Sequence, residues 1–216
     1  MWRQGETNWI PEPDDSSFSA QTVAAFQFLV SDCGFGIPSF RGPNIRVPPM
    51  VGDDFEEVRF ESDKVFVSIS RCPSRLEWAV EIGLLRHPPD EEKGFSVAEL
   101  TVLDAPEHDV HGWTSMWPDT LLPKALAERA QALKEYGRSA LVGDAAIFES
   151  LATARSKRLR EHWAAQRLAD AARKAADAFR RKNWAEVVSL LAPLGAKLSP
   201  AQRKKLDYAR KREHPQ

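Results

Sequence analysis

The sequence predicts an α+β protein, in which a small antiparallel β-sheet of about three strands packs with helices and an all-α basic C-terminal segment follows. Three runs of alternating apolar and polar residues lie between Glu57 and Leu85. Such alternation is typical of strands with one buried face. From Asp119 onward strand patterns are replaced by sequence rich in Ala, Leu, Lys and Arg, which favours helices.

The charge divides the chain at nearly the same place. Residues 1–120 carry 9 Lys+Arg against 21 Asp+Glu, and residues 121–216 carry 21 against 10. The net charge of -1 therefore conceals an acidic body and a basic helical part. We expect a flexible N-terminal arm at 1–17, an acidic α+β domain at 18–118 and a basic helical region at 119–216. Within this region, 164–212 form a hairpin-like unit.

The segment before the sheet predicts one helix and one irregular connection. An amphipathic pattern runs from about Ser19 to Cys33, and Gly34 is a suitable residue to end that helix. Four prolines lie between Gly36 and Asp54. Because proline cannot donate a backbone hydrogen bond, this stretch is expected to be an irregular connection or a sheet edge.

The three strands separate an inward face from an outward face. The inward side chains are expected to be apolar and to be covered by helices: Val58, Phe60, Val65, Val67, Ile69, Trp78, Val80 and Ile82. The outward side chains are charged apart from one aromatic, which we expect to be exposed: Arg59, Glu61, Phe66, Glu77 and Glu81. This outward set is the candidate surface for binding a partner protein. An exposed cross-strand lattice of charges without function is the alternative.

After the sheet, the sequence around Ser96 predicts a capped helix. Ser96 and Glu99 have the spacing of a capping box, and Phe95 with Leu100 can form a hydrophobic staple. Pro106 requires that helix to be short.

Four further helices are expected in the C-terminal part. One runs from Leu122 to Tyr136 and stops at Gly137, and a second is capped by Asp144 and continues to about Lys182. The others are a helix at 184–191 and a final one after Ser199-Pro200. The spacing of small and large residues in 175–211 loosely resembles a single tetratricopeptide-type hairpin, with no second copy.

Candidate catalytic and metal-binding residues are sparse. Cys33 and Cys72 lie in different segments and indicate two reduced thiols in a cytoplasmic protein. Glu107 to His111 is the densest group of ligand-type side chains, and we interpret it as a polar loop with a metal site as the alternative. No catalytic residue, metal or cofactor is predicted. No apolar run reaches the length of about 18 residues that a membrane span requires, so we expect no membrane partner.

Five basic residues fall broadly opposite the apolar stripe of the long helix: Arg167, Arg173, Lys174, Arg180 and Arg181. A face of this kind is expected to be solvated or to meet a partner. Binding of a nucleic-acid backbone is the alternative, because basic helices bind phosphates with release of counterions.

A set of short motifs in residues 20–103 resembles one class of bacterial protein. The motifs are F-x-F-L at Phe26–Leu29, G-F at Gly34–Phe35, V-R-F-E-S at Val58–Ser62, V-E-I-G at Val80–Gly83, and the capped helix. They resemble uncharacterised bacterial proteins of immunity-protein type, which neutralise toxins. The resemblance implies a protein partner, such as a basic toxin domain, and supplies no catalytic residues.

The expected function is that of a non-enzymatic bacterial interaction protein whose acidic α+β body binds a protein partner. The alternative is a nucleic-acid-associated protein that uses the basic helical region. An enzymatic activity is left open.

Overall fold

The computed structural model describes residues 17–42, 55–73, 77–85, 94–107 and 119–213. The chain divides into two compact units, Met1–Ala154 (unit 1) and Arg155–Gln216 (unit 2). The expected arm at 1–17 lies outside the described residues except for Ser17. Among the described residues, no helix combines the length and the apolar character that a membrane crossing requires.

Unit 1 contains a five-stranded antiparallel sheet, so the expectation of about three strands was too low. The strands lie side by side in chain order: β1 (Ser39–Arg41), β2 (Glu56–Glu61), β3 (Val65–Cys72), β4 (Glu77–Leu84) and β5 (Phe95–Ser96). The three long strands are the three alternating runs of the sequence. The two additional edge strands have three and two residues, which is too short for alternation to be recognised.

The register of the long strands aligns their apolar residues on one face. Val67 lies opposite Phe60 on β2 and opposite Ile82 on β4. Ile69 is flanked in the same way by Val58 and Val80. All the residues predicted to point inward are buried and belong to one hydrophobic core.

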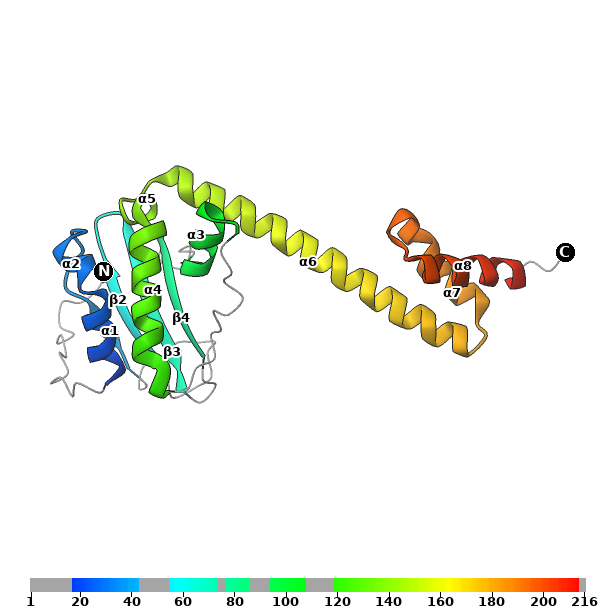
Figure 1. Ribbon diagram of the computed structural model, residues 1–216, viewed down its shortest axis with the longest axis horizontal. Coiled ribbons are helices and arrows are strands. Elements are labelled where there is room, and N and C mark those ends of the chain that lie inside the picture. The colour runs from blue at the N-terminus through cyan, green and yellow to red at the C-terminus, as the bar shows by residue number, and fades with distance from the viewer. Residues whose placement is uncertain (1–16, 43–54, 74–76, 86–93, 108–118, 214–216) are drawn as a thin grey trace, which may run out of the picture. The chain divides into compact units, whose positions relative to one another are not determined.

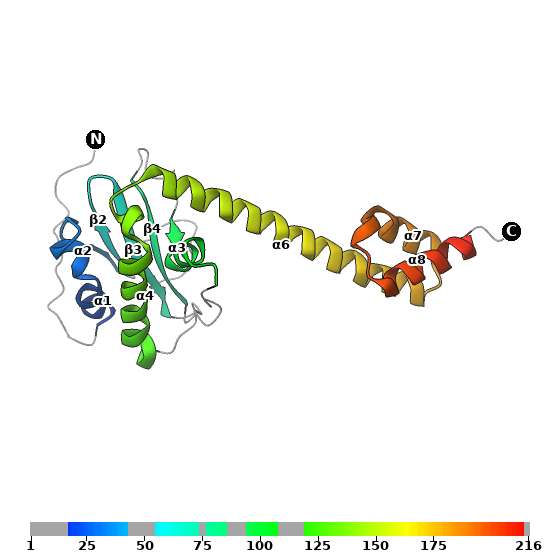
Figure 2. The ribbon, with the colours of Figure 1, turned by 45° about the horizontal axis from the view of Figure 1, so that its top comes forward.

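Helices cover this inner face of the sheet (Figures 1 and 2). They are α1 (Phe18–Phe26), α2 (Phe28–Ser31), α3 (Val97–Asp104), α4 (Leu122–Tyr136) and α5 (Arg138–Leu141). The single helix expected from Ser19 to Cys33 is thus divided at Gln27 into α1 and α2. Ser96 caps α3, and its capping box with Glu99 is formed as predicted.

Two arginines lie on aromatic rings of this core. The Arg71 guanidinium carbon is 4.8 Å from the centroid of Phe18, and that of Arg129 is 5.5 Å from the centroid of Trp78. Burial lowers the pKa of Arg129 to about 10, against an opposing effect of Glu128. Arg129 is therefore still protonated at neutral pH, and both contacts have the geometry of cation–π interactions.

The helices after residue 118 are divided between the two units. Leu126 and Leu133 of α4 and Phe148 and Leu151 of α6 (Ala145–Arg180) are buried in the same core as the sheet. The compact unit therefore extends to Ala154, whereas composition placed the boundary of the acidic domain at residue 118. The two units nevertheless differ in charge, because unit 1 carries 13 Lys+Arg against 25 Asp+Glu, and unit 2 carries 17 against 6.

Unit 2 is a small helical unit. It is built from the C-terminal part of α6, α7 (Trp184–Leu191), a 3-10 helix (Ala192–Lys197) and α8 (Pro200–Glu213). Its core consists mainly of small and aliphatic side chains: Ala175, Ala178, Val187, Leu191, Leu198, Leu206 and Ala209. Ala178 and Ala209 are completely buried, which is consistent with close approach of the helix backbones at these alanines.

The turn from α6 to α7 contains a strained lysine. The N–H of Lys182 donates to the Phe179 carbonyl and the N–H of Asn183 donates to the Ala178 carbonyl, the pattern of a Schellman motif. Lys182 has the position in that motif that glycine usually takes, with a φ of 59°. A side chain in this left-handed conformation costs about 1–2 kcal/mol.

We predict that Lys182→Gly stabilises unit 2. Removing the Cβ relieves the left-handed strain, and the gain is partly offset by the greater freedom of glycine in the unfolded chain, which leaves about 0.5–1 kcal/mol. Urea unfolding of the full-length chain measures the change. Lys174→Gly in the middle of α6 is the matched control and should destabilise by about 1 kcal/mol. A loss of stability for Lys182→Gly similar to that of the control would contradict this account.

Candidate functional site

The outer face of the sheet, opposite the helices, contains all five predicted partner-binding residues. Register pairs Glu61 with Phe66, Arg59 with Ser68, and Ser68 with Glu81. Glu77 lies opposite Cys72 in the last pair of the β3–β4 ladder. Glu61, Glu77 and Glu81 are exposed, so three carboxylates reach solvent from this face.

Phe66 is buried, which corrects the expectation of an exposed aromatic. Its exposed fraction is 4%. The Arg59 guanidinium carbon lies 4.1 Å from its ring centroid, and Arg59 Nε is 2.6 Å from Glu61 Oε1. On the other side its cross-strand neighbour is Gly83, which has no side chain. Arg59 therefore extends across the ring, and Phe66 supports the charged surface instead of contacting a partner itself.

Glu57 is an acidic residue of this face that the sequence analysis did not select. Its side chain is nearly buried, with 10% exposed. Ser68 Oγ donates to Glu57 Oε1 at 2.5 Å, and Arg41 Nη1 lies 3.5 Å from Glu57 Oε2. The same period-two alternation that selected Arg59 and Glu61 includes Glu57, so its position was predictable. Its burial and its partners depend on β1 and β3 and were not.

Glu81 packs against the start of β5. A Cβ added to Gly94 would lie 2.7 Å from Glu81 Oε2 and 3.0 Å from its Cβ. Gly94 therefore permits the chain to pass close to the glutamate, and the contact fixes one side of the Glu81 side chain. Of the three exposed carboxylates, Glu61 is held by Arg59 and Glu81 by packing.

No group of three or more His, Cys, Asp or Glu side chains that could hold a metal occurs among the described residues. The Glu107–His111 cluster lies outside the described residues from His108 onward. Burial raises the pKa of the Cys33 thiol, Asp32 raises it further, and Lys134 opposes them. A raised pKa leaves less thiolate at neutral pH and makes Cys33 a weaker nucleophile.

The basic face predicted on α6 is exposed, and several of its charges are paired. Arg167, Arg173, Lys174, Arg180 and Arg181 are all exposed. Arg173 Nη2 lies 3.1 Å from Asp170 Oδ1, and Arg180 forms an ion pair with Asp177. These pairs lower the net positive charge that this face offers to a phosphate backbone.

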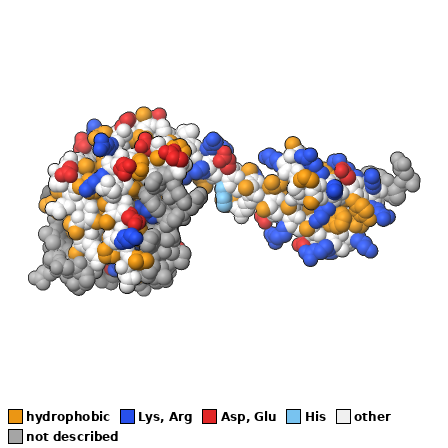
Figure 3. Space-filling view, viewed as in Figure 1, with side chains coloured by type: hydrophobic (Ala, Val, Ile, Leu, Met, Phe, Trp, Pro, Cys, Tyr) orange, Lys and Arg blue, Asp and Glu red, His pale blue; other side chains and the backbone are white. Residues whose placement is uncertain are grey.

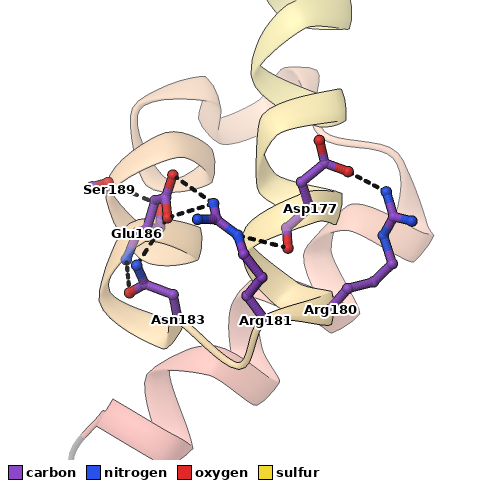
Figure 4. A network of polar contacts seen from close by, with 6 residues as sticks. All are labelled: Asp177, Arg180, Arg181, Asn183, Glu186 and Ser189. Carbon is purple, nitrogen blue, oxygen red and sulfur yellow. Dashed lines mark hydrogen bonds and ion pairs between the residues drawn. The ribbon is translucent and has the colours of Figure 1, made fainter.

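Arg181 belongs to a polar network that connects α6 with α7 (Figure 4). Its Nη2 lies 3.1 Å from Glu186 Oε2, and its Nε donates to the Asp177 carbonyl at 3.4 Å. Asn183 caps α7 by accepting from the N–H of Glu186, and its Nδ2 donates to the Glu186 carboxylate. Arg181 thus has a structural role in the turn.

A cluster of three aromatic rings on unit 2, here called the aromatic triad, was not predicted. Phe179, Trp184 and Tyr208 have centroids 5.1–5.6 Å apart. Tyr208 is 42% exposed. It is surrounded along α8 by four basic residues, here called the basic rim: Lys204, Lys205, Lys211 and Arg212. Figure 3 shows hydrophobic side chains gathered over α7 and α8 with Lys and Arg side chains around them.

The basic rim has a recognisable signal in the sequence. Its members stand at positions i−4, i−3, i+3 and i+4 relative to Tyr208, which are the neighbours of a residue on a helix surface. The other two rings come from α6 and α7, so the triad itself depends on how the three helices pack. Comparison of the chain with protein-family models, with curated proteins and with solved structures finds no match.

We predict that Phe66→Ala destabilises unit 1 by roughly 3 kcal/mol, because it removes a large buried ring. Arg59→Gln, which keeps the buried ring but removes the cation over it and the ion pair with Glu61, should cost about 0.5–1 kcal/mol. Urea unfolding of the full-length variants measures both. Glu77→Gln, an exposed change on the same face, is the control and should leave stability within about 0.5 kcal/mol. If Phe66→Ala is as mild as this control, the ring does not support the surface as described.

Proposed function

We propose that the protein is a non-enzymatic interaction protein of immunity type, which acts in the cytoplasm and binds a basic partner protein through the outer face of the unit 1 sheet. The observation that supports this most strongly is the set of exposed carboxylates Glu61, Glu77 and Glu81 on one face of a sheet whose other face is covered by helices.

The backbone ladder supports the proposal because it holds these carboxylates in place before binding. β2 pairs with β3 over six residue pairs, and β3 pairs with β4 over eight. Binding groups on a rigid scaffold lose less conformational entropy when a partner binds. Arg59, already paired with Glu61, leaves the face with an excess of negative charge.

The charge of the whole unit supports a basic partner. Unit 1 carries 12 more acidic than basic residues, as its 25 Asp+Glu and 13 Lys+Arg show. Complementary charge steers diffusional encounter and raises the association rate constant, kon, more than it raises the final affinity. A toxin domain with a basic, nucleic-acid-binding surface has the required chemistry.

The test is association of the full-length chain with the purified products of the adjacent genes. We expect one basic product to bind, with a kon that falls as salt rises from about 50 to about 500 mM. Combined Glu61→Gln, Glu77→Gln and Glu81→Gln should lower kon by about 10-fold at low salt, because steering charges at the contact are lost.

A matched control removes the same number of charges from unit 1 away from this face. Glu128, Glu135 and Glu149 are exposed residues of α4 and α6, and their combined change to Gln should affect kon by less than about twofold. Equal losses for the two variants would show that only total charge matters. Absence of any basic binding partner would refute the proposal.

A further inference from the structure

We propose that unit 2 binds single-stranded nucleic acid at the aromatic triad, with a base stacked at Tyr208 and phosphates bound by the basic rim. This site lies in a different unit from the face proposed above and binds a different class of ligand. The inference therefore does not rest on the proposed function.

Within the triad, the Tyr208 ring is held in place by contacts with two neighbouring rings. The Tyr208 centroid lies 5.6 Å from that of Phe179 and 5.4 Å from that of Trp184. The planes of these two rings are inclined to the Tyr208 plane by 49° and 72°, respectively. Phe179 and Trp184 are half-buried against the unit 2 core, while Tyr208 retains 42% exposure. A ring that is held by two neighbouring rings and remains partly exposed can stack on a base with little loss of side-chain entropy.

The basic rim places cations on both sides of that ring along the helix. Arg212 Nε donates to the Tyr208 hydroxyl at 3.2 Å, and its guanidinium carbon is 5.4 Å from the ring centroid. Lys205 Nζ is 5.8 Å from the centroid of Phe179. Lys204 and Lys211 are exposed, one turn before and one turn after Tyr208.

A ligand that satisfies this site must alternate a flat apolar group with anionic groups. Single-stranded nucleic acid has this chemistry, because each base is flanked by phosphates and its faces are free to stack on aromatic side chains. In a duplex the base faces are already stacked on one another, so Tyr208 would have nothing to stack on. The 17 Lys+Arg against 6 Asp+Glu of unit 2 add a favourable release of counterions.

The rim also differs from the basic face of α6. Arg173 and Arg180 of α6 and Arg181 of the following turn are paired with acidic side chains. Within the part of the chain that the structure describes, the four members of the basic rim form no ion pair, and two of them lie on aromatic rings. The charge of the basic rim is therefore available to phosphate next to the exposed Tyr208 ring.

The experiment is fluorescence anisotropy of dye-labelled oligonucleotides of about 15 nucleotides, which is near the upper site size of common single-strand-binding folds. The full-length chain is titrated into oligo(dT), oligo(U) and a duplex of equal length at several salt concentrations. We expect the single strands to bind at least about 10-fold more tightly than the duplex, because only single strands offer free base faces.

Two variants separate stacking from charge. Tyr208→Ala should weaken single-strand binding by about 10-fold and leave the slope of log K against log salt unchanged, because it removes stacking and no charge. Combined Lys204→Gln and Lys211→Gln should weaken binding and reduce that slope by about 1.4, which corresponds to two phosphate contacts on a single strand. Circular dichroism and thermal unfolding check that each variant is folded.

Two controls keep the proposal falsifiable. Tyr208→Phe retains the ring and its packing and should bind within about twofold of the natural chain, even if Tyr208→Ala unfolds unit 2. Combined Lys174→Gln and Lys197→Gln removes two exposed cations outside the basic rim, and should leave affinity within about threefold. Equal binding of duplex and single strand, equal losses for the rim and control pairs, or no binding at low salt would overturn the proposal.

Discussion

Burial of one face of the sheet is the constraint on which the structure of unit 1 depends. Val67 and Ile69 of the central strand β3 are completely buried, and their neighbours on β2 and β4 are buried as well. Because strand side chains alternate, burying these residues directs Arg59, Glu61 and Glu81 to the opposite face. The same core includes Phe148 and Leu151 at the start of α6. The acidic surface is thus a geometric consequence of the hydrophobic core.

The sequence predicted best the features that depend on neighbouring residues. The Ser96–Glu99 capping box, the ends of α4 and the three long strands could all be recognised from local patterns. β5 could not, and β1 was covered only by the sheet-edge alternative for the proline-rich stretch after Gly36, because strands of two or three residues exist only through their partners on β4 and β2. The burial of Phe66 likewise depends on Arg59 and Gly83, which lie on the two neighbouring strands.

The limits of the sequence prediction in unit 2 have a different physical origin. An alanine-rich helix can be placed correctly from its pattern, while its packing angle depends on which small residues face each other. The triad joins residues from three helices, so only its α8 member and the surrounding cations carry a local signal. At Lys182 the packing overrides a local preference. Lysine disfavours the left-handed backbone conformation, yet the two Schellman hydrogen bonds hold Lys182 in it.

The two proposals assign ligands of opposite charge to the two oppositely charged units of one chain. A basic protein surface is attracted by unit 1 and repelled by the excess of cations on unit 2, and the reverse holds for a nucleic acid. Charge alone would let either polymer bind wherever the sign is right. The fixed carboxylates on the sheet and the exposed Tyr208 ring add a requirement for shape and chemistry at each surface. Because a net charge of -1 averages over both units, the binding properties of this chain follow from where its charges are placed rather than from their sum.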